Sequence, residues 1–328
     1  MSVYPFLIGH IEDYDDNKPH KLTIQTKPYV IWVSKDKNVN ILSDVCPHLG
    51  GSLSRGSLVD NDTKVQCPFH VQQFDGLGNL NGVKNKCFFD LPFYRVVNGL
   101  IWFGPQQFDD DVIPNFEFIN DPQVHFGASA PARVVNSPFR KLLGIGNDVN
   151  HAAGTHNNSM GIDRVVVEDK QLNGGNDFKV KLKFYFKKFT FEQKLKSPFL
   201  FFVNVEKYFS DVFSFFPTLF LSRSVTNIGT SYSIFYFYPQ DENTSVSGAI
   251  YYSSANILLD LLFKKSSIYV LNNIIDEDMF ETESQYDVEP AFNLINDEIR
   301  HNAVMQWLTT ANMMTTESKA NRKNLVVK

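Results

Sequence analysis

The chain has 328 residues, 43% of them hydrophobic, and a formal net charge of −5. This length is enough for two domains with substantial cores. The acidic balance and the lack of a dense Lys/Arg run argue against nucleic acid as a partner. The first residues do not form a basic and then apolar leader, and polar residues interrupt the Phe-rich stretch 199–221. We therefore expect no secretory signal and no membrane span.

The cysteine count bears on the compartment. Three cysteines in a chain of this length exclude a disulfide framework. We therefore expect a reducing compartment, the cytoplasm.

The first part of the chain is predicted to form short β-strands. Runs rich in β-branched and aromatic residues are separated by polar turns, which is the rhythm of an antiparallel sheet. The runs are 21–26, 29–34 and 39–42. Further on, residues 91–104 predict two strands joined by the Asn98-Gly99 turn.

Between these strands lie two Cys/His pairs, Cys46-Pro47-His48 and Cys67-Pro68-Phe69-His70. Thiolates and imidazoles at these spacings suit a metal centre, and a two-iron, two-sulfide cluster with cysteines on one iron and histidines on the other fits the mixed set. Such a set is the Rieske type. A Cys₂His₂ zinc site is the alternative, but zinc modules usually group Cys with Cys and His with His.

After the aspartates at 109–111, which predict a polar linker and a domain boundary, comes a second possible ligand motif. Asp148, His151 and His156 are spaced so that they can converge on one ion from a helix and the bend after it. By itself a His pair at this spacing is a weak signal, so the motif needs a further ligand elsewhere in the chain.

The rest of the chain alternates strand and helix patterns. Lysines alternate with apolar residues over 178–186, which predicts a half-exposed strand. A helix is expected over 257–271, ending at an acidic stretch 276–281, and an amphipathic helix from Pro290 to Leu308. Most aromatic residues between 178 and 252 are interpreted as core, although they would also suit an apolar pocket. Three further strands are predicted at 222–226, 231–238 and 245–252.

In this order, the two motifs resemble the oxygenase component of Rieske non-haem iron oxygenases, in particular the monooxygenase and O-demethylase branch. Besides the ligands, the resemblance takes in Leu53-Ser54 with Gly56, the pair Phe74-Asp75 and the step Glu277-Asp278. It implies an α+β fold with an N-terminal all-β Rieske [2Fe-2S] domain, residues 1–108. It also implies a catalytic domain, residues 109–316, with a curved antiparallel sheet flanked by helices, and residues 317–328 are expected to form a flexible tail.

The resemblance also implies an activity. The chain is expected to use O₂ and electrons from a ferredoxin and/or a flavin reductase to hydroxylate or oxidatively demethylate a small organic molecule, and to assemble as a homotrimer. Two alternatives stay open: a ring dihydroxylating dioxygenase and a non-catalytic Rieske electron-transfer protein.

Residue roles follow from the same resemblance. Cys46, His48, Cys67 and His70 would hold the cluster. His151, His156 and Asp278 would hold a mononuclear Fe(II), with Asp276 and Glu281 as rivals for the carboxylate. Asp148 would bridge His151 to His70 of a neighbouring subunit and carry electrons between the centres.

The sequence departs from the family at one place. Members usually continue His-Gly-Trp after the second Cys/His pair, whereas this chain has Val71 and Gln72 after His70. The change puts the reduction potential and the docking of the electron donor in doubt, but it leaves the ligands in place.

Overall fold

The computed structural model describes residues 4–81, 83, 87–104, 107–172, 178–227, 229–254, 257–286 and 297–308. Within these residues no helix is long and apolar enough to cross a membrane. Cys46, Cys67 and Cys87 are free thiols.

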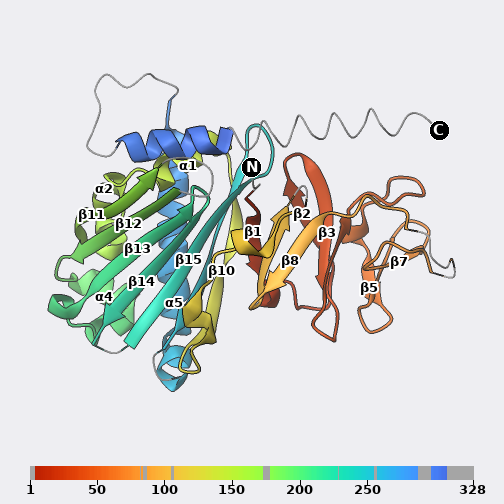
Figure 1. Ribbon diagram of the computed structural model, residues 1–328. Helices are drawn as coiled ribbons and strands as arrows, with labels where there is room; N and C mark the ends of the chain where they lie inside the picture. The colour runs from red at the N-terminus through yellow and green to blue at the C-terminus, as the bar shows by residue number, and fades with distance from the viewer. Residues whose placement is uncertain are drawn as a thin grey trace.

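The N-terminal third is built from short antiparallel strands, as predicted (Figure 1). In the closing hairpin, Asn98 and Gly99 have φ angles of 52° and 79°, the left-handed pair that a tight two-residue turn requires. The strands form three three-stranded sheets: β1 (Phe6–His10), β9 (Leu100–Gly104) and β8 (Phe93–Val97); β2 (His20–Ile24), β3 (Lys27–Val33) and β4 (Val39–Ser43); and β5 (Ser57–Val59), β6 (Lys64–Gln66) and β7 (Gln73–Asp75).

The rest of the chain is organised around one seven-stranded sheet in which every neighbouring pair is antiparallel. The strands predicted at 178–186, 222–226, 231–238 and 245–252 all belong to it, so these predictions are confirmed. In spatial order the strands are β10 (His125–Val135), β16 (Ser245–Ser253), β15 (Gly229–Pro239), β14 (Leu219–Thr226), β13 (Phe209–Phe216), β12 (Phe178–Phe186) and β11 (Ile162–Leu172).

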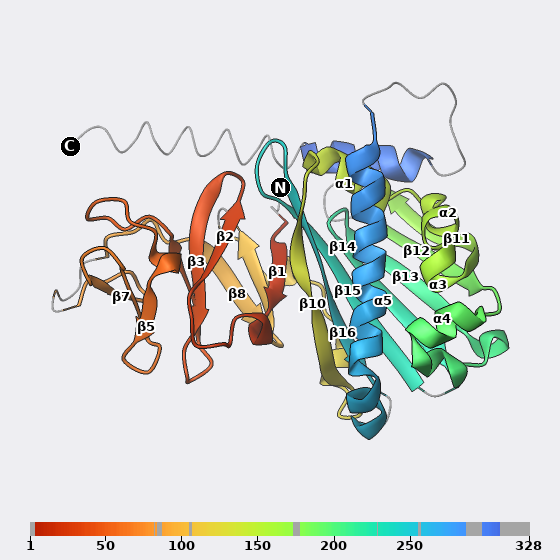
Figure 2. The same cartoon turned by 180° about the vertical axis from the view of Figure 1, so that it is seen from behind.

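One long helix, α5 (Ile257–Ser284), runs across a face of this sheet (Figure 2). The expectation that this helix ends at the acidic stretch was wrong, because no Gly or Pro interrupts 257–284 and the acidic residues continue the helix. Shorter helices lie beside it: α1 (Phe139–Gly146), α2 (His151–Thr155), α3 (Asn157–Met160) and α4 (Phe191–Lys196). Residues 297–308 are helical, whereas the start of the predicted closing helix and the predicted tail lie outside the described residues.

Within the described residues, six single-turn 3₁₀ helices connect these elements. They are η1 (Ile11–Asp13), η2 (Leu53–Arg55), η3 (Asp110–Val112), η4 (Glu117–Asn120), η6 (Pro198–Phe201) and η7 (Val205–Lys207). The predicted polar linker contains η3. Its aspartates are polar, but the neighbouring Phe108, Val112 and Ile113 are buried in the main core described next.

The main core is shared between the N-terminal strands and the large sheet. It joins Phe6 of β1 and Trp102 of β9 to Tyr236 and Ile250 of the seven-stranded sheet. Because apolar contacts continue from one part to the other, the two parts stabilise each other. The domain boundary after residue 108 stays a prediction.

Candidate metal centres

The first Cys/His pair lies after β4 and the second after β6, in two loops with the same backbone hydrogen bonds. The Cys46 N–H donates to the Gly51 carbonyl (2.8 Å), and the Gly50 N–H donates back to the Cys46 carbonyl (2.9 Å). In the other loop the Cys67 N–H donates to the Gln72 carbonyl (2.8 Å), and the Val71 N–H donates to the Cys67 carbonyl (3.1 Å). Each loop therefore holds its cysteine and histidine in a fixed turn.

These loops bury the cysteine sulfur atoms in the protein and leave the histidine rings at the surface. Cys46 and Cys67 are buried, whereas His48 and His70 are exposed with ring centroids 4.7 Å apart. Burial raises the pKa of the Cys46 thiol, and the neighbouring Cys67 thiol raises it further. Two adjacent thiols and two adjacent imidazoles fit a cluster whose two irons take different ligand types.

Space around the sulfur atoms is tight. A Cβ atom added to Gly51 would lie 3.2 Å from Sγ of Cys67, so any larger residue would press on the sulfur. The glycine therefore allows the loop backbone to pass close to the ligand.

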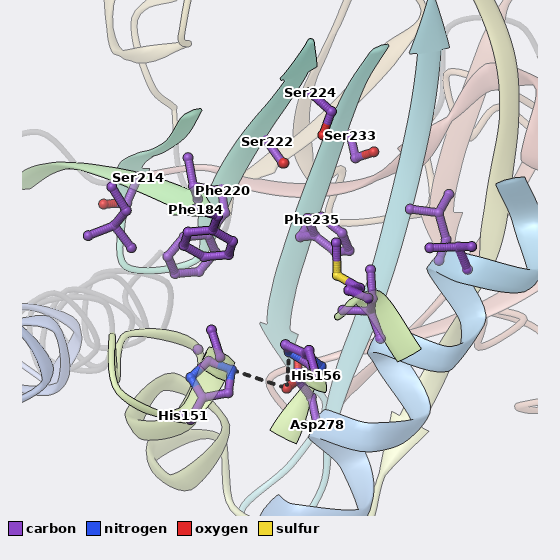
Figure 3. A pocket seen from close by; sticks show the side chains of 18 of the residues that line it. His151, His156, Phe184, Ser214, Phe220, Ser222, Ser224, Ser233, Phe235 and Asp278 are labelled. Atoms are coloured by element: carbon purple, nitrogen blue, oxygen red, sulfur yellow. Dashed lines mark ion pairs between the residues drawn. The ribbon is translucent and has the colours of Figure 1, made fainter. Parts of the chain in front are cut away.

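The second group of ligands comes from α2 and α5. His151 begins α2, His156 caps its C-terminal end, and Asp278 lies on α5. The potential ligand atoms of these three residues all lie within 4.8 Å of one another. Oδ1 of Asp278 is 3.4 Å from Nε2 of His151 and 3.2 Å from Nε2 of His156 (Figure 3).

The donor atoms fit a metal ion. Oδ1 of Asp278 is buried and has no hydrogen-bond donor among the described residues. The Nδ1–H of His151 donates to the Asp148 carbonyl, and the Nδ1–H of His156 donates to Oε2 of Glu277 (2.8 Å). Because each acceptor fixes the ring proton on Nδ1, both Nε2 lone pairs are directed to the same point as the Asp278 carboxylate.

The two rivals for the carboxylate ligand are directed elsewhere. Asp276 is exposed and pairs with Arg133, and Glu281 is exposed one turn further along α5. The side chain of Asp276 leaves α5 on roughly the opposite side from Asp278, and Glu281 lies one turn beyond Asp278, so of these three the structure brings Asp278 to the histidines.

Glu277 is the residue that sequence reasoning missed. Besides accepting from His156, its Oε2 accepts from the Ser159 hydroxyl (2.6 Å). Burial alone would lower the pKa of His156, but Asp278 and Glu277 outweigh it and raise the pKa to about 9. Burial acts to raise the pKa of Asp278, and the two imidazoles outweigh it and lower the pKa well below its usual range. The only signal in the sequence was the position of Glu277 directly before Asp278.

Asp148 contacts His151 through its backbone carbonyl, whereas the prediction concerned its carboxylate. Oδ1 of Asp148 accepts from the Asn150 N–H (2.9 Å), and the residue lines the cavity described next. The bridge from Asp148 to His70 of another subunit involves two copies of the chain and stays a prediction.

A cavity of about 180 Å³ opens at the three ligand residues and extends between α5 and the large sheet (Figure 3). Its wall is mainly apolar and includes Phe184, Phe220 and Phe235. Some of the aromatic residues interpreted as core therefore line a pocket. The arrangement offers one metal position at the end of an apolar chamber.

Residues 4–90 match the family profile described as "Rieske [2Fe-2S] domain". Over 90 residues the chain is 34% identical to the oxygenase component of 3-ketosteroid-9-alpha-monooxygenase from Rhodococcus rhodochrous, covering 27% of this chain and 20% of that protein. Over 73 residues it is 40% identical to cholesterol 7-desaturase nvd 1 from Ciona intestinalis, covering 22% and 15%. The matched segments therefore span about a fifth or less of these relatives.

The likeness to solved structures extends over nearly the whole chain. Dicamba monooxygenase bound to dicamba superposes with a TM-score of 0.70 at 20% identity, covering 96% of this chain and 98% of that one. NdmA of Pseudomonas putida CBB5 with caffeine gives a TM-score of 0.63 at 16% identity, covering 96% and 91%. The cluster ligands lie inside the matched domain, and the second ligand group lies in the part matched by fold. The chain thus contains a Rieske [2Fe-2S] domain at residues 4–90 and has the overall fold of the dicamba monooxygenase chain.

Proposed function

We propose that this chain is the oxygenase component of a Rieske non-haem iron oxygenase. It uses O₂ and electrons from a ferredoxin and/or a flavin reductase to hydroxylate, or oxidatively demethylate, a small and partly apolar organic molecule. The proposal places the enzyme in the cytoplasm.

The observation that carries the proposal is the convergence of His151, His156 and Asp278 at one end of an apolar cavity. Two imidazoles and one carboxylate on ferrous iron leave open positions for O₂ beside an organic substrate. The chain's own contribution is to orient both rings through Asp148 and Glu277 and to bring the substrate to the iron in a largely apolar chamber.

In this proposal Cys46, His48, Cys67 and His70 hold the [2Fe-2S] cluster that receives the electrons. The exposed imidazoles of His48 and His70 lie beside exposed apolar side chains, among them Leu49, Phe69 and Val71. Such a surface suits contact with another protein. We propose that it meets the electron donor and, in a homotrimer, the neighbouring subunit near Asp148.

The test is metal analysis combined with turnover. Purified protein should contain one iron beyond the two that accompany acid-labile sulfide. His151→Ala should lose that iron and all product formation while keeping the sulfide and the visible absorbance. His301→Ala, which changes an exposed histidine on the helix 297–308, is the matched control and should behave like the wild type.

The same measurements separate the alternatives. An electron-transfer protein would hold no third iron, and a zinc module would lack sulfide and colour. Incorporation of ¹⁸O₂ into product, read by mass, distinguishes addition of one oxygen atom from addition of two.

Asp148→Asn should keep both metal centres but stop reduction-dependent turnover, and normal turnover by this variant would contradict the proposed bridge.

A further inference from the structure

The cavity changes character along its length. At one end lie His151, His156 and Asp278, and the strands β14 and β15 form part of the opposite wall. Phe220 pairs with Phe235 across these strands. Ser224 lies four residues beyond Phe220 on β14, which is roughly 13 Å at about 3.3 Å per residue.

Beyond the aromatic pair, four serines form what we call the serine wall: Ser222, Ser224, Ser231 and Ser233. Ser222 pairs directly with Ser233, and Ser224 with Ser231, so all four hydroxyls lie on the same face of the sheet. Figure 3 shows Ser222, Ser224 and Ser233 together, at the far side of the pocket from His151 and Asp278.

The serine wall has unused hydrogen-bonding capacity. The hydroxyls of Ser222 and Ser224 contact Ser210, whereas those of Ser231 and Ser233 have no side-chain partner in the described part of the chain. Each hydroxyl can donate once and accept twice, and half-buried hydroxyls without partners cost free energy. Two such hydroxyls, Ser231 and Ser233, beside the two serines that contact Ser210 in a mainly apolar chamber indicate that a polar group is bound there.

The charge of the cavity restricts that group. Among the described lining residues, the ionisable carboxylates are Asp148 and Asp278, and neither Lys nor Arg takes part. A carboxylate or phosphate at the serine wall, on the far side of the pocket from His151 and Asp278, would have no Lys or Arg partner there and would lose its hydration. A neutral hydroxyl or carbonyl oxygen costs far less to remove from water, and hydrogen bonds with the serines as donors or acceptors can offset that cost.

We propose that the serine wall binds a neutral oxygen function of the substrate, at the end away from the carbon that is oxidised. The inference rests on the proposed function and narrows its substrate class to elongated, uncharged, mainly apolar molecules with a hydroxyl or carbonyl at the distal end. Anionic aromatic acids are poor ligands.

The test is binding of three matched probes to the metal-loaded protein by titration calorimetry: 4-cyclohexylphenol, cyclohexylbenzene and 4-cyclohexylbenzoate. The phenol should bind roughly tenfold more tightly than the hydrocarbon, as expected for about two neutral hydrogen bonds, and the benzoate should bind most weakly. The double variant Ser231→Ala/Ser233→Ala should remove the preference for the phenol. Ser214→Ala is the matched control, since Ser214 lines the cavity from β13 and its hydroxyl donates to the Val180 carbonyl.

Equal binding of phenol and hydrocarbon to the wild type would mean that only water occupies the serine wall and would overturn the inference. Tightest binding by the benzoate, or the same loss in Ser214→Ala as in the double variant, would also overturn it. Iron and sulfide contents are measured on the same samples. If they are intact while the probes are not discriminated, the inference fails and the proposed function stands; if the mononuclear iron is absent from the wild type, the proposed function fails.

Discussion

At the residue scale, Val71 is in an unusual conformation. It occupies the same place in its loop as Gly50 in the other, and its φ of 52° is as left-handed as the 74° of Gly50. A β-branched residue in this region costs about 1–2 kcal/mol, which a glycine would avoid. The departure from His-Gly-Trp therefore stores strain beside His70.

Val71→Gly should relieve this strain. The Val71 side chain is 66% exposed, so its removal loses little buried area. We expect a net stabilisation of the loop by about 1 kcal/mol, seen as a roughly fivefold slower loss of the visible cluster absorbance on heating. Val71→Ala keeps the Cβ atom and should gain less. Equal half-lives for the glycine and alanine variants would contradict the strain argument.

Glu277→Gln tests the residue that orients His156. The amide oxygen can still accept both hydrogen bonds, but it lacks the charge that the Nδ1–H of His156 and the Ser159 hydroxyl now share. Affinity for the mononuclear iron should fall by about 10–100-fold, as for other groups that orient a metal-binding histidine. Iron titration of the metal-depleted protein measures this, and the sulfide content should not change.

The control for Glu277 lies on the same helix. Glu281→Gln changes an exposed carboxylate one turn further along α5 and should leave the iron affinity unchanged. If both variants lost the same affinity, the effect would come from the net charge of α5 rather than from the contact to His156.

At the element scale, α5 connects the metal site to the substrate cavity. Ser267, Leu271, Ile274 and Asp278 follow one another at spacings of three and four residues and line the cavity from one face of the helix. The helix must therefore continue through the acidic stretch to present Asp278. The sequence pattern suggested an end there because a dense run of acidic residues looks like an exposed boundary.

The loop before the first cysteine depends on one buried carboxylate. Asp44 is only 3% exposed, and it accepts from the Ser52 hydroxyl (2.7 Å) and the Ser54 N–H (2.6 Å) at the start of η2. Hydrogen bonds to a charged group contribute about 1.5–3 kcal/mol each, and removal of the carboxylate takes this acceptor from both the Ser54 N–H and the Ser52 hydroxyl, which keeps only its contact with the Ser54 hydroxyl. Asp44 therefore fixes the loop that carries Cys46.

Asp44→Ala should destabilise this loop by about 3 kcal/mol and lower the cluster content of the purified chain. Acid-labile sulfide per chain is the measurement. Asp60→Asn is the control, because Asp60 is exposed in a turn and its ion pair with Lys64 contributes little. Full cluster content in Asp44→Ala would show that the loop holds its shape without the carboxylate.

At the scale of the whole molecule, the two metal-ligand motifs and their order along the chain were predictable from the sequence. The arrangement of the strands in space was not. The Cys/His spacings and the motif at 148–156 point to metal ligands because few other roles need those residues so close together. Strand periodicity also located β12, β14, β15 and β16. Which strand lies beside which depends on contacts between distant segments, such as the pairing of β10 with β16, and local patterns do not encode these contacts.

The same limit explains two features that were not foreseen. The serine wall exists only because two strands bring their serines into register, and each strand alone shows an ordinary polar alternation. The core shared by β1, β9 and the large sheet joins residues that are far apart in the chain. In the sequence, only the polar segment between the two parts was visible, and it suggested two parts with separate cores.

His10 lies in this shared region and should make the stability of the chain depend on pH. Its ring stacks on Phe126 at 4.1 Å, its Nδ1 accepts from the Glu12 N–H, and burial lowers its pKa to about 4. Since the unfolded chain binds this proton near pH 6.5 and the folded chain does not, stability should fall as the pH drops from about 6.5 to about 4. The loss attributable to His10 should be about 3 kcal/mol.

His10→Asn isolates this effect. The Asn side-chain oxygen can still accept from the Glu12 N–H, but it does not titrate. Asp13, whose pKa burial raises, gains a proton over part of the same range and offsets some of the loss, but it does so in both proteins. The free energy of unfolding in urea should therefore fall by about 3 kcal/mol more in the wild type than in the variant when the pH is lowered from 7 to 4. If the difference stayed constant with pH, His10 would be accessible to protons in the folded chain, and the contact between β1 and the large sheet would be open to water.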